Sequence, residues 1–135
     1  MSSVLVDVRE HVAVISLNRP HKHNAIDDEL HASLGDAVSS AVADDEVRVL
    51  LLRGEGPSFS SGRDTSALGN RGPDDTHFAH LRRSQRLNLM LSDAPKPVVA
   101  ALKGHVLGMA LETALAADIR VIAKGARLGL PEAAL

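Results

Sequence analysis

The stretch Val47-Arg48-Val49-Leu50-Leu51-Leu52 ends in an unbroken apolar run. Such a run is typical of a strand that is covered on both faces of a sheet. Two later segments, residues 98–102 and residues 119–123, have the same apolar character. We therefore expect these three segments to be buried strands of one sheet.

Helical patterns lie between these strands. Residues 28–43 place apolar side chains at the i, i+4, i+7, i+8 and i+11 positions of one buried stripe, and Asp27 or Asp28 is the expected cap. A second helix is expected over residues 76–91, and a short apolar helix over residues 108–117. Because strands that alternate with helices require crossover connections, the pattern predicts an α/β fold.

Short strands are also expected near both ends of the chain. Residues 4–8 and 11–17 are rich in β-branched side chains, and Arg9-Glu10 between them suits a tight hairpin. Residues 127–130 form a last short element. No linker or internal repeat interrupts this order, so residues 1–135 are expected to form one domain.

The composition argues against several classes of protein. Aromatic residues make up 1% of the chain, with no Trp or Tyr, so there are no platforms on which nucleobases could stack. The formal net charge of −2 favours no polyanionic partner. The absence of cysteine excludes disulfides, thiolate zinc sites and cysteine nucleophiles. No apolar run approaches the roughly 20 residues of a membrane span, and no signal peptide precedes the first strand, so a cytoplasmic protein is expected.

Phosphate-loop and metal sites can be tested against the sequence. The Gly-rich loop of residues 54–64 lacks the Gly-Lys-Ser/Thr, and the helix directly after it, that define a phosphate loop. His21 and His23 have no third ligand in reach by sequence. His77 and His80 share their predicted helix with arginines that would repel a cation. No metal site is therefore expected.

The stretch Gly104-His105-Val106-Leu107-Gly108-Met109-Ala110-Leu111-Glu112 is the strongest candidate for chemistry. It places a glycine before an apolar helix, whose free N–H groups form a potential anion site. Glu112 follows Met109 by three residues, so the two lie on nearly the same face and a carboxylate stands beside a free N–H. A second acid, Glu132, follows Pro131. From the residues alone, a helix-stabilising Glu112 and a solvated Glu132 remain the simpler interpretation.

Several stretches taken together resemble the enoyl-CoA hydratase/isomerase (crotonase) superfamily in order and spacing across essentially the whole chain. They are Leu17-Asn18-Arg19-Pro20 with Asn24-Ala25, Arg48-Val49-Leu50-Leu51-Leu52, Phe59-Ser60-Ser61-Gly62-Arg63-Asp64, Lys96-Pro97-Val98-Val99-Ala100-Ala101, Ala117-Asp118-Ile119-Arg120 and Leu128-Gly129-Leu130-Pro131-Glu132. The resemblance implies a crotonase-like spiral of ββα units. The family's chains are considerably longer, so its C-terminal helical part is expected to be absent from this chain.

The resemblance also implies a site. The backbone N–H groups of Arg63 and Met109 would form an oxyanion hole, and Glu112 and Glu132 match the positions and interval of the two catalytic glutamates of the hydratases. The family implies an acyl-CoA thioester substrate, no metal and no separate cofactor, and a homo-oligomer such as a trimer when the C-terminal part is present. The implied substrate-binding positions are Arg63, Asp64, Thr65, Ser66, Gly108 and Met109.

This sequence departs from the family's pattern at three positions. Met109 stands where the family usually has Gly or Ala, and its side chain would narrow the acyl pocket. Lys103 replaces the Asn commonly found before Gly104. Arg63 places a cation beside the path of CoA.

The implied activity is the hydration of 2-trans-enoyl-CoA thioesters to 3-hydroxyacyl-CoA. Glu132 would donate a proton to C2, and Glu112 would orient water for attack at C3. An enoyl-CoA isomerase, in which Glu132 alone moves the proton, and a non-catalytic acyl-CoA-binding or assembly subunit remain alternatives. For a hydratase, the Arg63 and Met109 N–H groups should lie roughly 3 Å from one oxygen atom. The two carboxyls should face one space, with Glu112 the better enclosed.

Overall fold

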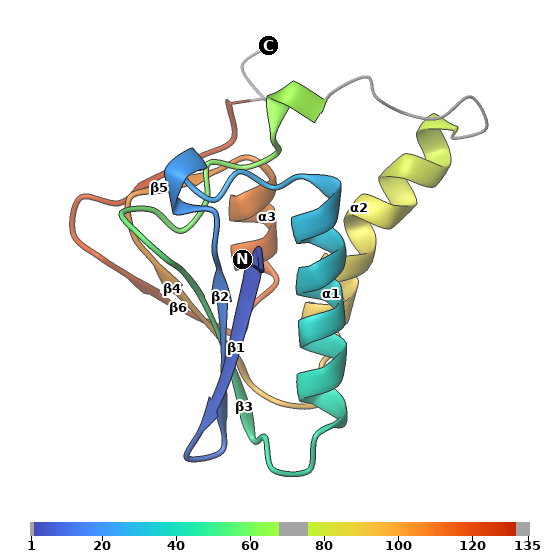
Figure 1. The fold of residues 1–135 in the computed structure, drawn as a ribbon, viewed down its shortest axis with the longest axis vertical. Coiled ribbons are helices and arrows are strands. Elements are labelled where there is room, and N and C mark those ends of the chain that lie inside the picture. The colour runs from blue at the N-terminus through green and yellow to red at the C-terminus, as the bar shows by residue number, and fades with distance from the viewer. Residues whose placement is uncertain (1, 68–75, 132–135) are drawn as a thin grey trace.

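The computed structural model describes residues 2–67 and 76–131. The larger sheet has the strand order β1-β2-β3-β4-β6, and β5 and β7 form a second, two-stranded sheet. The β1–β2 pair is antiparallel and all other pairs are parallel. Figure 1 shows α1, α2 and α3 on one side of the larger sheet. The elements are β1 (Val4–Arg9), β2 (Val12–Leu17), η1 (Pro20–Lys22), α1 (Asp28–Ala43), β3 (Val49–Gly54), η2 (Thr65–Ala67), α2 (His77–Ser92), β4 (Val98–Leu102), β5 (His105–Leu107), α3 (Met109–Leu115), β6 (Ile119–Ile122) and β7 (Arg127–Gly129).

A two-residue turn joins β1 to β2. Arg9 pairs with Val12, so Glu10 and His11 form the turn, one residue later than the sequence predicted. Both have positive φ, 48° for Glu10 and 68° for His11. Two positive φ values in a row are characteristic of a type I′ turn, whose twist matches that of the flanking strands.

The helix α1 begins and ends where the apolar pattern predicted. Of the two candidate caps, Asp27 is the N-cap, and its carboxylate accepts a hydrogen bond of 2.8 Å from the Leu30 N–H. The buried residues of this helix are Leu30, Leu34, Val38 and Ala41, which form one stripe against the sheet. Packing of this stripe against the sheet fixes the position of the N-terminal end of α1, which lies at the candidate functional site.

In the middle of the larger sheet, strand β3 is fully buried only on the face that the helices cover. In β3, Leu50 and Leu52 are completely buried, whereas Val49 and Leu51 are half-buried. The expectation that this strand is covered on both faces is therefore wrong for the described residues. The side chains that alternate with the buried ones point to the face that α1 and α2 do not cover.

The expectation of burial is also wrong for β6. This strand belongs to the same sheet as β3 and β4, as predicted, but all four of its residues are exposed, with Val121 60% exposed. Its place at the edge of the sheet explains the difference, because β4 is its only strand partner among the described residues. A groove of about 440 Å³ lies beside it, with Leu51, Ala101 and Ile122 in its wall.

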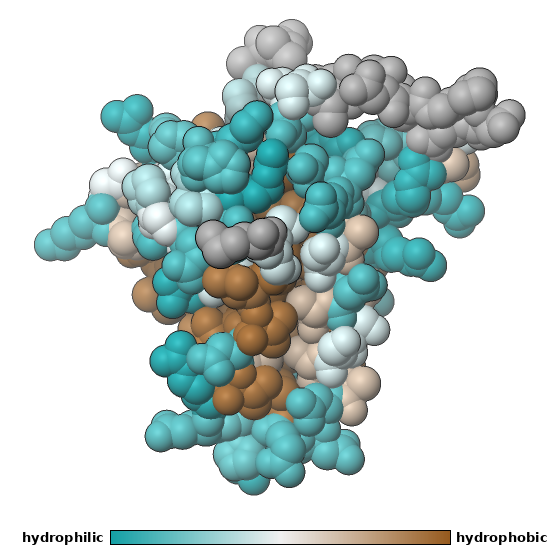
Figure 2. Space-filling model, viewed as in Figure 1, coloured by the Kyte–Doolittle hydropathy of each residue, from teal (hydrophilic) through white to brown (hydrophobic). Residues whose placement is uncertain are grey.

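Apolar side chains are also exposed at the opposite edge of the sheet. Figure 2 shows them over β1 and the adjacent face of α1. Val6 and Val8 belong to this surface, since both are exposed although they point to the helix side.

None of the helices in the described part of the chain has the length and hydropathy that a membrane span requires.

Candidate functional site

The loop after β3 is held against the rest of the chain rather than lying open on the surface. Phe59 and Ser60 are buried, and their N–H groups donate to the carbonyl oxygens of Lys103 and His105, at 2.8 and 3.0 Å. Ser60 in turn accepts a hydrogen bond from the Leu107 N–H at 3.2 Å. The loop therefore forms a parallel bridge with β5, a strand that the sequence did not predict. Residues 68–72, the end of this Gly-rich region, lie outside the described residues.

Gly62 brings the loop into close contact with the start of α3. Its φ is +95°, and a Cβ built on it would lie 2.5 Å from the Leu107 carbonyl oxygen and 3.7 Å from the Met109 nitrogen. Only a residue without a side chain fits such an approach. The two backbone segments expected to supply an oxyanion hole are thus side by side.

The Arg63 N–H lies on the free side of its segment. Ile26 donates to the Gly62 carbonyl oxygen at 2.8 Å and accepts from the Asp64 N–H at 2.9 Å. This bridge uses the groups before and after Arg63, so the N–H of Arg63 itself points away from Ile26. In the part of the chain that the structure describes, it has no hydrogen-bond acceptor.

The Met109 N–H, too, has no hydrogen-bond acceptor among residues 2–67 and 76–131. Met109 is the first residue of α3, where N–H groups have no acceptor within the helix. Gly108, with φ of +56°, turns the chain into the helix, and its N–H donates to the Gly129 carbonyl oxygen at 2.9 Å. Two free donors at adjoining backbone segments are chemically suited to bind one oxygen that carries negative charge. Their convergence on a single point stays a prediction.

Of the two predicted catalytic acids, Glu112 lies within the described residues. Glu112 lies in the first turn of α3, and its side chain is exposed. The apolar helix therefore does not enclose the Glu112 side chain within the described residues, and whether Glu112 is better enclosed than Glu132 stays a prediction. The reason is that α3 turns Ala110, Thr113 and Ala114 to the core, which leaves Glu112 on the outer face. Glu132 lies outside the described residues, so a shared space for the two carboxyls stays a prediction.

The remaining predicted substrate-binding residues surround the same loop. Asp64 is buried, whereas Thr65 and Ser66 are exposed in η2. The Ser66 hydroxyl and N–H donate to one Asp64 carboxylate oxygen, at 2.6 and 3.0 Å, and Arg19 donates to the other at 3.1 Å. These hydrogen bonds, first those from Ser66 and then that from Arg19, lower the pKa of Asp64 to about 2. Asp64 is thus ionised at neutral pH, and its carboxylate is hydrogen-bonded within the protein.

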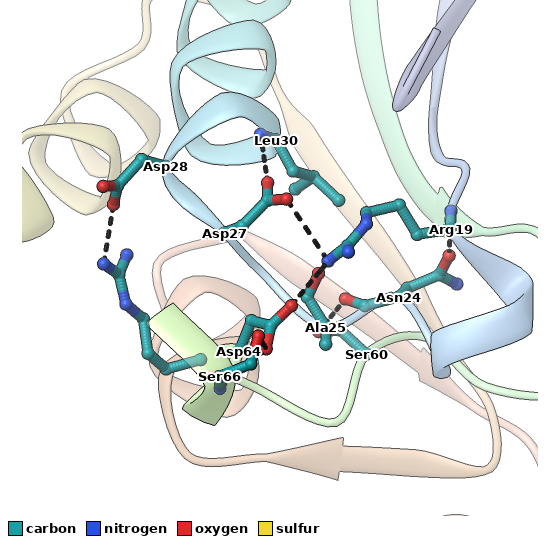
Figure 3. A network of polar contacts seen from close by, with 10 residues as sticks. Arg19, Asn24, Ala25, Asp27, Asp28, Leu30, Ser60, Asp64 and Ser66 are labelled. Atoms are coloured by element: carbon teal, nitrogen blue, oxygen red, sulfur yellow. Dashed lines mark hydrogen bonds and ion pairs between the residues drawn. The ribbon is translucent and has the colours of Figure 1, made fainter. Parts of the chain in front are cut away.

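Sequence reasoning missed the residues that support this loop. Figure 3 shows the Arg19 guanidinium between the carboxylates of Asp27 and Asp64, with Asn24 beside it. Asn24 is completely buried and donates to the carbonyl oxygens of Glu55 and Ser58, at 2.9 Å each. The only signal in the sequence was their presence in the Asn18-Arg19-Pro20 and Asn24-Ala25 motifs.

The histidines do not form a metal centre among residues 2–67 and 76–131, where no group of three or more His, Asp or Glu side chains is placed to hold an ion. His23 and His105 meet edge to face, with ring centroids 5.4 Å apart. This contact joins the residue after η1 to β5, and the Ser58 hydroxyl oxygen accepts a hydrogen bond from the backbone N–H of His105 at 3.1 Å. Their role visible in the structure is packing.

Comparison with known proteins places this arrangement in a family. The family model described as enoyl-CoA hydratase/isomerase matches residues 7–135. The chain belongs to the enoyl-CoA hydratase/isomerase family. It is 38% identical over 118 residues to "Probable enoyl-CoA hydratase EchA14" of Mycobacterium tuberculosis, and the match covers 87% of this chain and 46% of that protein. It is 36% identical over 136 residues to a "Probable enoyl-CoA hydratase" of Bacillus subtilis, and the match covers 98% of this chain and 51% of that protein.

Solved structures of the enoyl-CoA hydratase/isomerase family have the same fold. An enoyl-CoA hydratase/isomerase from Xanthobacter autotrophicus matches with a TM-score of 0.92 at 35% identity, covering 98% of this chain and 50% of that one. An enoyl-CoA hydratase from Thermoplasma volcanium matches with a TM-score of 0.90 at 34% identity, covering 99% and 53%. These likenesses confirm the crotonase-like α/β fold. The chain spans about half the length of the curated relatives it matches.

Proposed function

We propose that the protein hydrates 2-trans-enoyl-CoA thioesters to 3-hydroxyacyl-CoA. The observation that supports this proposal is the close approach of Gly62 to Leu107 and Met109, which brings together the two backbone segments that carry the N–H groups of Arg63 and Met109. The relatives named as hydratases, at 36–38% identity, support the same reaction class. CoA is part of the substrate, and the proposed chemistry needs no other cofactor.

In the proposed reaction, the thioester oxygen accepts hydrogen bonds from the N–H groups of Arg63 and Met109. Water adds its oxygen to C3 while the C2–C3 π electrons move toward the thioester, so negative charge develops on that oxygen. Fixed donors aimed at developing charge cost no reorganisation during the step, and removal of one such donor typically lowers the rate about 10²- to 10³-fold. The side chain of Met109, which is partly buried, would border the acyl group.

Proton movements complete the proposed reaction. Glu112 takes the proton of the attacking water, and Glu132 gives a proton to C2, so that H and OH are added across the double bond. Glu112 fits this role because it lies one turn along α3 from Met109, on nearly the same face of the helix. The roles of both acids, the substrate-binding positions and a homo-oligomer such as a trimer, formed when the C-terminal part is present, are predictions from the family resemblance. A cytoplasmic location is a prediction from the sequence.

The test is hydration of crotonyl-CoA by the natural gene product that contains residues 1–135. Loss of the enoyl absorbance is expected for the wild type, with a decrease in kcat of about 10²- to 10⁴-fold for Glu112→Gln. Glu10→Gln is the matched control, because Glu10 is an exposed acid in the β1–β2 turn. Folded wild-type protein that leaves the absorbance unchanged would exclude a hydratase.

An isomerase is the second candidate. A 1,2-epoxyphenylacetyl-CoA isomerase of Escherichia coli is 34% identical over 133 residues, covering 94% of this chain and 50% of that protein. The isomerase proposed here is an enoyl-CoA isomerase, which differs in substrate from that epoxide isomerase. It would move a proton between carbons without adding water, convert a 3-enoyl-CoA to a 2-enoyl-CoA and raise the enoyl absorbance. Binding of acyl-CoA without either reaction would identify a non-catalytic binding subunit.

A further inference from the structure

Arg19 joins three segments of the chain at the edge of the proposed oxyanion site. One terminal nitrogen of its guanidinium, Nη1, donates to the Ala25 carbonyl oxygen at 2.6 Å and to the Asp64 carboxylate at 3.1 Å. The same nitrogen lies 3.5 Å from the carboxylate of Asp27, the N-cap of α1. Figure 3 shows this guanidinium between the two carboxylates. The turn after β2, the start of α1 and the loop after β3 therefore meet at a single side chain.

The contact between Arg19 and Asp64 is largely shielded from water. The Arg19 side chain is 16% exposed and that of Asp64 is 10% exposed. Removal of one partner from such a pair leaves the other charge buried without compensation, which is far more disruptive than loss of a surface ion pair. Both Asp64 carboxylate oxygens are occupied, one by Ser66 and one by Arg19, so the carboxylate has little freedom to shift.

A second ion pair provides an internal comparison. Arg63 donates from its own side chain to Asp28 at 2.6 Å, but the Asp28 side chain is 80% exposed. Exposed pairs of this kind contribute little to stability and are screened by salt. The Arg63–Asp28 pair connects the loop to the start of α1 directly, whereas Arg19 connects it through Asp64 on one side and Asp27 on the other. Of the two loop contacts, only the Arg19–Asp64 pair is enclosed.

We propose that Arg19 is a positioning residue that fixes the Arg63 N–H in the oxyanion site by holding Asp64 against the start of α1. The inference rests on the proposed function. Arg63 directly precedes Asp64 in the chain, and the Asp64 N–H is already bonded to Ile26, so a shift of the Asp64 side chain would pull on the Arg63 peptide. Displacement of such a donor weakens binding of the charged transition state more than binding of the neutral thioester.

The test compares Arg19→Met, Arg19→Lys and the control Asp28→Asn in the natural gene product that contains these residues. The readouts are kcat and KM with crotonyl-CoA, and the infrared carbonyl stretch of a bound acyl-CoA thioester, which falls when donors polarise the oxygen. For Arg19→Met we expect a decrease in kcat of about 10- to 100-fold and a change in KM smaller than that in kcat. The carbonyl stretch should shift less from its value in the free thioester than it does in the wild-type protein. Asp28→Asn should retain the wild-type kcat and carbonyl shift.

Arg19→Lys decides the matter if Arg19→Met does not fold. A lysine keeps the charge, but its single ammonium cannot reproduce the planar fork of the guanidinium, so an intermediate kcat and carbonyl shift are expected. If the folded Arg19→Met and Arg19→Lys variants keep the wild-type carbonyl shift and kcat, Arg19 has no positioning role, and the proposed function is unaffected. A wild-type protein that neither hydrates crotonyl-CoA nor polarises the bound carbonyl would refute the proposed function, and the positioning role with it.

Discussion

Gly62 and Leu107 approach so closely that a Cβ at position 62 would lie 2.5 Å from the Leu107 carbonyl oxygen. Gly62→Ala should therefore push the loop after β3 away from the start of α3, in addition to straining a φ of +95°. We expect kcat for enoyl-CoA hydration to fall by about 10²- to 10³-fold, as when an oxyanion donor is lost. Steady-state kinetics on folded Gly62→Ala, with wild-type circular dichroism as the criterion for folding, measure this effect. Unchanged kcat would show that the contact is not needed for catalysis.

A glycine in α1 provides the matched control. A Cβ at Gly35 would meet no atom within 4 Å, and Gly35 lies in the middle of the helix. Glycine in a helix interior is destabilising by roughly 0.5–1 kcal/mol relative to alanine. Gly35→Ala should therefore raise the free energy of unfolding by about that amount and leave kcat unchanged. Denaturation by urea measures the gain, and a loss of stability would contradict the open environment of Gly35.

His31 should make stability depend on pH. Burial lowers the pKa of His31 from its ordinary value of 6.5, against smaller opposing contributions from Ser84 and Asp28. The folded protein then binds the His31 proton less readily than the unfolded chain does. This contribution to folding is complete above pH 6.5 and is lost as the pH falls toward the lower, folded-state pKa.

The measurement is the free energy of unfolding across this range of pH. The His31 contribution should have a slope below about 1.4 kcal/mol per pH unit, because a single group is involved and its side chain is only partly buried. His31→Gln should remove that part of the slope, whereas His21→Gln, at an exposed position in η1, should leave it. Equal slopes for wild type and His31→Gln would show that another group controls the dependence.

The sequence predicted those parts of the fold that depend on local pattern. The stripe of α1 and the three apolar strand segments were found because their periodicity and composition are visible within each segment. The strand β5 was missed because it has three residues between Gly104 and Gly108, too few to show a period. Its hydrogen-bond partners, Ser60 and Arg127, are far away in the chain.

Contacts between distant segments explain the other differences. The composition of β6 shows that the strand is apolar, but not which elements pack against it. Its exposure at the edge of the sheet could therefore not be predicted from its residues. In the sequence, Arg19 stands out only as part of the Leu17-Asn18-Arg19-Pro20 stretch that resembles the family. Its partner Asp64 is 45 residues away, and no spacing rule links the two positions. The start of α3, in contrast, was a candidate anion site from its residues alone, whereas the pairing of Met109 with Arg63 came from the family resemblance. The close approach at Gly62 adds a structural argument for that pairing.

The last prediction concerns Asn24, whose side-chain amide is bonded in a way that fixes its orientation. The Nδ2 group donates to the carbonyl oxygens of Glu55 and Ser58, and Oδ1 accepts from the Arg19 N–H at 2.7 Å. Asn24→Asp keeps the shape but replaces two donated bonds with a carboxylate oxygen facing two carbonyl oxygens, in a site with no exposure to solvent. Because each unsatisfied buried polar group costs about 1–3 kcal/mol, and a charged one more, we expect a loss of at least about 3 kcal/mol in the free energy of unfolding.

Asn18→Asp is the control. The Asn18 amide makes one exposed hydrogen bond, to the Ser2 carbonyl oxygen, so the loss in free energy of unfolding for Asn18→Asp should stay below about 1 kcal/mol. Urea denaturation of both variants measures the difference, and equal losses would show that Asn24 does not hold the loop in place.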